Sequence, residues 1–272
     1  MKKNLTIIVF LIIALVAIGL IFRNSKSNNE IPKGEESVIT TEDAIVAESF
    51  ETKVLNPDDL YVTFDVKYPS FIKADDSFNT SIENLVKTKM DEHLKASQEY
   101  WQARLDTQIK GDNISKVPSK EDKLSFFSDF NIVQSNSIYI SFVLKYGGFS
   151  GGAHGYETET SFNYDMSLKK IVMLDSLFPN DSKYLTTISN ISRESLKKQF
   201  ATMSDEDKAN STPEAVQEYI DNMVSMIESG TEPKIENFSV FTFTDDKVKI
   251  YFAEYQVGPY VIGMPEVEIN RK

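Results

Sequence analysis

The chain of 272 residues contains no cysteine, which excludes disulfide bridges, thiol nucleophiles, thiolate metal sites and a lipid-modified amino-terminal cysteine. Positive charge is also scarce: 29 lysines and arginines stand against 41 aspartates and glutamates, giving a net charge of −12. Such a surface repels nucleic acid and anionic lipid headgroups and attracts cationic proteins or peptides, although solubility alone also explains it. We therefore expect no nucleic-acid partner.

One long apolar run lies near the start of the chain, from Leu5 to Phe22, with Thr6 as its only polar side chain. As a helix with a rise of about 1.5 Å per residue it spans roughly 27 Å, close to the ~30 Å core of a bilayer. Two lysines precede the run, as in an export signal. We expect residues 5–22 to be a single-pass membrane anchor that leaves the rest outside the cytoplasm. Cleavage near Gly19 would instead give a secreted protein.

The remainder is a polar, acidic and flexible linker at 23–49, followed by residues 50–272, which are patterned like a folded region. Alternation from Leu60 to Val66 predicts a strand that ends at Pro69. Further strands are expected at 124–133, 138–146, 156–164, 171–174, 238–244, 248–255 and 267–269, and helices at 79–105, 182–203 and 213–229. Thr80 has capping-box spacing, and Gly230 stands where a left-handed C-cap would lie.

Strands and helices follow one another in blocks, which predicts an α+β fold. We expect mostly antiparallel sheets with three helices packed on one face. The first domain is placed at 50–150 and the second at 151–272.

Glycine is concentrated in one place: five of the eleven glycines fall within residues 147–155, between two expected strands. Glycine is needed where φ is positive or where another group approaches closely. The segment lacks the lysine and hydroxyl of a phosphate-binding loop and precedes a strand, which disfavours nucleotide binding. It is either an irregular hairpin connection or a ligand-contact loop that presents Phe149, Ser150 and His154, with Tyr156 next along the chain.

A second segment, 253–269, is rich in glycine, proline and tyrosine. It contains two Gly/Pro pairs, each of which interrupts strand geometry, so we expect the chain to leave one strand and enter another here. Tyr255 and Tyr260 flank the first break. Each is either a core residue with a satisfied hydroxyl or an exposed aromatic anchor, and the core is the commoner place for a tyrosine in this setting.

Several of these motifs together resemble the extracytoplasmic domain of lysozyme-sensing bacterial anti-sigma factors. They are Gly151-Gly-Ala-His-Gly155, Asn163-Tyr-Asp165, Leu174-Asp-Ser-Leu-Phe178 and Tyr255-Gln-Val-Gly-Pro-Tyr-Val-Ile-Gly-Met-Pro265. That family also occurs as a non-catalytic domain beside peptidoglycan deacetylases. Tyr68-Pro69 before the expected helix is similar to the companion domain usually found upstream.

The resemblance implies a bacterial, membrane-anchored binding module without catalytic function, whose ligand is lysozyme-like or another cationic or wall-associated partner. Its ligand-binding residues would be Phe149, Ser150, His154, Tyr156, Tyr255 and Tyr260. Only four residues precede the apolar run, so we expect no sigma-binding segment. His93 and His154 lie 61 residues apart, so we also expect no deacetylase metal site and no cofactor.

Two other functions stay open. Glu157, Glu159 and Asp165 alternate on one expected strand and could belong to a hydrolase, or to an accessory domain, acting on peptidoglycan. Such alternation more often marks the solvent-exposed face of a strand. The remaining alternative is a structural spacer in the cell envelope.

Overall fold

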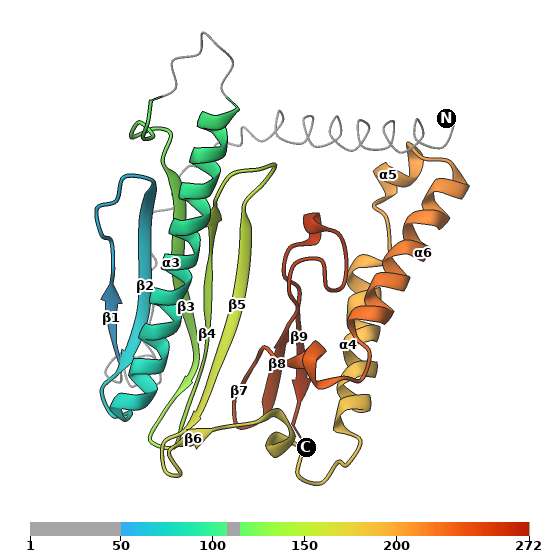
Figure 1. Cartoon of the computed structure of the whole chain (residues 1–272). Helices are drawn as coiled ribbons and strands as arrows, with labels where there is room; N and C mark the ends of the chain where they lie inside the picture. Colours follow the sequence, from blue (N-terminus) through green and yellow to red (C-terminus); the bar gives the residue numbers. More distant parts are fainter. Residues whose placement is uncertain (1–49, 108–114, 272) are drawn as a thin grey trace, which may run out of the picture. The chain divides into compact units, whose positions relative to one another are not determined.

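The computed structural model describes residues 50–107 and 115–271. The expected membrane anchor at 5–22 and the linker at 23–49 lie outside these residues. Within the described part, no helix combines the length and the apolar character that crossing a membrane requires. The α+β prediction is confirmed: two sheets alternate with helices, as Figure 1 shows.

The first sheet has six strands in sequence order. They are β1 (Phe50–Val54), β2 (Val62–Phe71), β3 (Leu124–Ser135), β4 (Tyr139–Phe149), β5 (Tyr156–Asp165) and β6 (Lys170–Ile171). Only β2 and β3 pair in parallel, and α3 (Asp76–Asp106) forms the crossover between them. A parallel pair requires such a crossover, because a tight turn can join only antiparallel strands.

The second sheet has three antiparallel strands, β7 (Phe241–Phe243), β8 (Lys247–Tyr251) and β9 (Glu266–Asn270). Helices α4 (Tyr184–Phe200), α5 (Asp205–Ala209) and α6 (Pro213–Gly230) precede it. Short 3₁₀ turns lie at Leu174–Leu177, Ile235–Phe238 and Tyr260–Ile262.

Strand β2 and helix α3 both differ from the sequence prediction at one end. Strand β2 continues through Pro69, because residues 67–71 pair with β1 while residues 62–66 pair with β3. Pro69 therefore has a neighbouring strand on one side only. Proline, which lacks a backbone N–H, is tolerated at such an edge position. Helix α3 begins one turn before Thr80, because the Asp75 carboxylate accepts the backbone N–H of Phe78 at 2.9 Å and caps the first turn.

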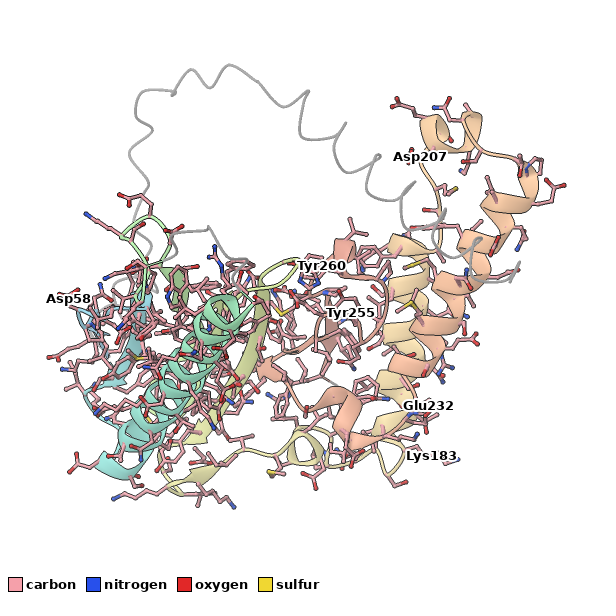
Figure 2. All side chains as sticks on the ribbon, turned by 45° about the horizontal axis from the view of Figure 1, so that its top comes forward. Asp58, Lys183, Asp207, Glu232, Tyr255 and Tyr260 are labelled. Carbon is pink, nitrogen blue, oxygen red and sulfur yellow. The ribbon has the colours of Figure 1, made fainter. Side chains whose placement is uncertain are left out.

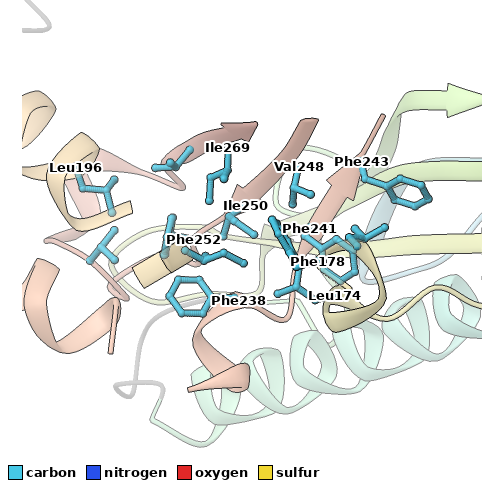
Figure 3. Packing of buried hydrophobic residues seen from close by; sticks show 14 of the residues in the cluster. Leu174, Phe178, Leu196, Phe238, Phe241, Phe243, Val248, Ile250, Phe252 and Ile269 are labelled. Atoms are coloured by element: carbon cyan, nitrogen blue, oxygen red, sulfur yellow. The ribbon is translucent and has the colours of Figure 1, made fainter. Parts of the chain in front are cut away.

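Each sheet covers its apolar face with its own helices, so the expected packing of three helices on one face is wrong. Helix α3 lies on the six-stranded sheet and buries Phe78, Ile82, Val86 and Met90 against it (Figure 1). Helices α4 and α6 belong to a separate core with the three-stranded sheet. Figure 3 shows this second core, which includes Leu196, Phe238, Ile250, Phe252 and Ile269. Each of the two sheets has an apolar face, and each face is buried by its own set of helices.

A polar junction joins the two sheets. The Asn163 amide of β5 donates to the backbone carbonyl of Phe241 at 2.7 Å, and its oxygen accepts the Ser141 hydroxyl at 2.7 Å. The same Ser141 oxygen accepts the backbone N–H of Phe243 at 2.9 Å. The Ser161 hydroxyl accepts the N–H of Phe241 at 3.1 Å. Side chains of the first sheet thus bind the backbone of β7.

His93 of α3 is buried against the sheet, with only 2 % of its surface exposed. Its Nδ1 lies 2.9 Å from the hydroxyl of Tyr156, while Nε2 finds no hydrogen-bond partner among the described residues. Burial lowers the pKa of His93 to about 4. The imidazole is therefore neutral at pH 7 in the folded chain.

The buried histidine predicts a loss of stability in mild acid. Below pH 6.5 the unfolded chain takes up a proton at position 93, while the folded chain does so only near pH 4. Stability therefore falls as the pH falls. We expect the wild type to lose about 2 kcal/mol more than His93→Gln between pH 7.5 and pH 5. Urea unfolding at several pH values measures this difference. Parallel curves for wild type and His93→Gln would contradict the prediction.

Candidate functional site

Three of the six predicted site residues, His154, Tyr255 and Tyr260, come together and form what we call the aromatic cluster. The Tyr255 hydroxyl lies 3.2 Å from Nε2 of His154. The rings of His154 and Tyr260 stack with centroids 4.2 Å apart, and those of Tyr255 and Tyr260 are 5.8 Å apart. Figure 2 shows the two tyrosines next to each other.

The aromatic cluster is exposed. Tyr255 keeps 52 % and Tyr260 keeps 37 % of its surface open to solvent, and His154 is exposed as well. The expectation that both tyrosines belong to the core is therefore wrong. Three aromatic rings side by side on the surface form a patch whose apolar faces and polar atoms are both accessible to a ligand.

The glycine segment positions His154. Gly151 has φ +99° and packs so closely on the ring of Tyr100 that a Cβ would lie 2.2 Å from it. The carbonyl of Gly155 accepts Nδ1–H of His154 at 2.6 Å and the Tyr260 hydroxyl at 3.3 Å. Because Nδ1 donates, a neutral His154 accepts the Tyr255 hydroxyl at Nε2. The donor hydrogens of all three side chains are thus used inside the cluster.

The end of α6 positions Tyr255. The Gln256 side chain donates to the carbonyls of Gly230 and Asn237 at 3.0 and 2.9 Å. Gly230 is not a left-handed cap but the last helical residue, and a Cβ there would lie 2.0 Å from the carbonyl oxygen of Gln256. Tyr255 itself has φ +63°, an uncommon conformation for a bulky residue that persists only where the surroundings enforce it.

The other three predicted residues lie apart from the cluster contacts. Successive residues of a strand point to opposite faces, so Tyr156 turns toward α3 and binds His93, while Glu157 faces the other way. Phe149 is the last residue of β4, opposite Ser125, and Ser150 follows it.

A carboxylate cluster lies on the same face of β5 as Glu157. Glu157 pairs with Lys145 of β4 at 2.5 Å, and Glu266 of β9 pairs with Lys249 of β8 at 2.8 Å. Between them, Oε2 of Glu159 is buried and has no hydrogen-bond partner among residues 50–107 and 115–271. Burial raises the pKa of Glu159 to about 7, with Glu266 and Glu157 adding to the shift and Lys145 and Lys249 opposing it. A carboxyl with this pKa can hold a proton at neutral pH.

This cluster corrects the expectation of a solvent-facing row of acids on β5. Glu159 is half-buried, and Asp165 is buried and accepts the backbone N–H groups of Ser167 and Leu168 in a turn. Lys249 and Glu266 were missed as site residues. Their alternation with apolar residues in β8 and β9 indicates a polar face, but the sequence does not show that β5 meets it. In residues 50–107 and 115–271, no group of three or more His, Asp or Glu side chains is placed to hold a metal ion.

Comparison with known proteins gives two family matches. Residues 56–157 match a family described as "Deacetylase PdaC", and residues 175–272 match "Protein of unknown function (DUF3298)". The peptidoglycan-N-acetylmuramic acid deacetylase PdaC of Bacillus subtilis (strain 168) is 28 % identical over 210 residues. The match covers 76 % of this chain but only 40 % of that relative.

One solved structure agrees with this chain at the level of the fold. A member of the DUF3298 family from Bacteroides fragilis is 17 % identical, with a TM-score of 0.51 over 81 % of this chain and 90 % of that one. A DUF3298 family protein from Pseudomonas aeruginosa PAO1 is 13 % identical over the same shares, with a TM-score of 0.45.

These matches overturn three expectations from the sequence. The resemblance to the anti-sigma factor domain is wrong, because the matches are to PdaC and DUF3298. The lysozyme-binding module and the absence of catalytic function are overturned by the similarity to a peptidoglycan deacetylase. The chain is thus similar to a protein named as a peptidoglycan deacetylase, over 40 % of that protein's length.

Proposed function

We propose that this chain acts on peptidoglycan, with the aromatic cluster binding the glycan and Glu159 transferring a proton in a hydrolytic step. The observation that carries the proposal is the half-buried Glu159, whose pKa is raised to about 7 beside two other carboxylates. The similarity to a peptidoglycan deacetylase supports the choice of substrate. Peptidoglycan lies outside the cytoplasm, where the expected anchor at 5–22 would place the chain.

The two clusters are close enough to serve one substrate. Gly155, whose carbonyl binds Tyr260, lies four residues before Glu159 along the same segment. Glu157 lies between them, and two residues of a strand span about 7 Å. A chain of two or three sugar rings is long enough to lie on the aromatic cluster and reach the Glu159 carboxyl.

The aromatic cluster suits a sugar. The faces of Tyr255, Tyr260 and His154 offer apolar surface to the C–H face of a sugar ring, while carboxylates and hydroxyls nearby can bind its hydroxyl groups. Sugars are amphipathic in this same way, because one face carries C–H groups and the rim carries hydroxyls.

Glu159 suits the role of general acid. In its protonated form it would give its proton to the leaving oxygen of a glycosidic bond while water adds to the anomeric carbon. Glu157, which forms an ion pair with Lys145, would be the second carboxylate and would accept the proton that the attacking water loses. A pair of carboxyl groups, one acting as acid and one as base, is the usual arrangement for this chemistry.

Loss of the acid should abolish hydrolysis. We expect the full-length chain to release soluble reducing sugars from purified peptidoglycan, and Glu159→Gln to lower that rate by about 100-fold or more. The wild-type rate should fall as the pH rises through about 7, because the acid must be protonated. Glu228→Gln is the matched control, since Glu228 forms an exposed ion pair with Lys197 on a different element. Absence of products from the wild type, or equal rates for Glu159→Gln, would refute the proposed reaction.

The same variant should change stability in a pH-dependent way. The folded chain holds a proton on Glu159 up to about pH 7, while the unfolded chain loses it near pH 4.5, so stability falls as the pH rises between these values. Glu159→Gln removes the buried charge. We expect its melting temperature to exceed that of the wild type at pH 8 and the difference to shrink toward pH 5. Glu228→Gln should show no such gain, and a Glu159→Gln variant less stable than wild type at pH 8 would count against a buried charge.

A further inference from the structure

We propose that the glycan bound by the aromatic cluster is de-N-acetylated, so that the site binds the primary ammonium group of an amino sugar in preference to an acetamido group. This inference rests on the proposed action on peptidoglycan and concerns which form of the glycan is recognised. It follows from the hydrogen-bonding capacity of the cluster and from the charges around it.

The donor hydrogens of the cluster are already committed. The Tyr260 hydroxyl and Nδ1 of His154 donate to the carbonyl of Gly155, and the Tyr255 hydroxyl donates to Nε2 of His154. An acetamido group brings a carbonyl that needs a donor, and binding it here would require breaking one of these bonds. Leaving that carbonyl without a donor is costly.

Acceptors, in contrast, are available. The carboxylate of the half-buried Glu254 stands next to Tyr255 in the chain and has no ion-pair partner in the described part of the molecule. Its charge and that of Glu157 act on Tyr260: partial burial first, and then these two carboxylates, raise the pKa of Tyr260. An alkylammonium group has three donors and no acceptor, which matches a site rich in acceptors.

The charge balance points the same way. Two carboxylates, those of Glu157 and Glu254, lie near the cluster, and Lys145 neutralises only the first. A cation over an exposed tyrosine ring is also attracted by the ring itself. The whole chain has a net charge of −12, so the carboxylates of unmodified peptidoglycan are repelled, while every amine exposed on the glycan adds an attraction.

If the bound glycan is de-N-acetylated, this chain acts after an N-deacetylation. The reaction that must supply its substrate is the hydrolysis of an N-acetyl group, in which water cleaves the amide bond to give acetate and the ammonium form of the sugar. The B. subtilis relative is named for an N-deacetylation of this class. The present chain would act on the glycan after such a step.

Matched oligosaccharides test the inference. Calorimetry on the full-length chain at pH 7 and low salt would compare the β-1,4-linked tetramer of glucosamine with the tetramer of N-acetylglucosamine. We expect the glucosamine tetramer to bind at least 10-fold more tightly and the preference to decline with added salt. Glu254→Gln should reduce the preference at least fivefold, and Glu228→Gln should leave the affinities for both tetramers unchanged.

Two further measurements separate recognition of the sugar from simple attraction between charges. Tetralysine carries the same number of side-chain amines without a sugar ring, and we expect it to bind at least 10-fold more weakly than the glucosamine tetramer. Tyr260→Ala should weaken binding of both tetramers. Equal binding of tetralysine, or a preference for the acetylated tetramer, would overturn the inference and leave the proposed action on peptidoglycan standing. Failure to bind either tetramer would overturn the inference and the glycan-binding role of the cluster together.

Discussion

The polar junction around Asn163 is the interaction on which the rest of the structure depends. Asn163 and Ser141 are almost fully buried, and together they bind both the carbonyl of Phe241 and the N–H of Phe243. A buried amide that lost these partners would carry a large desolvation cost, so the junction permits one placement of β7 against β4 and β5. That placement brings the outer face of β5 near Lys249 and Glu266, and it is the reason that a glutamate on an ordinary strand becomes a group with a pKa near 7.

Local rules account for most of the secondary structure. The period of apolar residues predicted α3, α4 and α6 and most of the strands, because each of these elements buries one face. The errors lie at the ends of elements, where a contact with another part of the chain sets the boundary. Pro69 stays inside a strand because of how β1 and β3 divide its neighbours, and α3 starts early because Asp75 provides a better cap than the expected Thr80.

In the candidate site, too, the sequence predicted local features but not the contacts between distant residues. The glycine segment and the carboxy-terminal tyrosines stood out in the sequence, but their contact joins residues about a hundred positions apart and has no local signature. Tyr255 is exposed because the turn that carries it is fixed from below by Gln256 and Gly230. Two of the charged groups around Glu159, Lys249 and Glu266, come from the second sheet, so no spacing rule along β5 could have found these two. Short motifs also misled the assignment of family, because the family matches are to PdaC and DUF3298.

The chemistry of the junction also bears on which features of β7 are constrained. Three side chains of the first sheet hydrogen-bond to main-chain atoms of β7, and nearly every residue type offers the same main-chain atoms. These hydrogen bonds therefore constrain the path of β7 more than the identity of its side chains. Ring contacts such as that between Tyr139 and Phe243 constrain the side chains themselves.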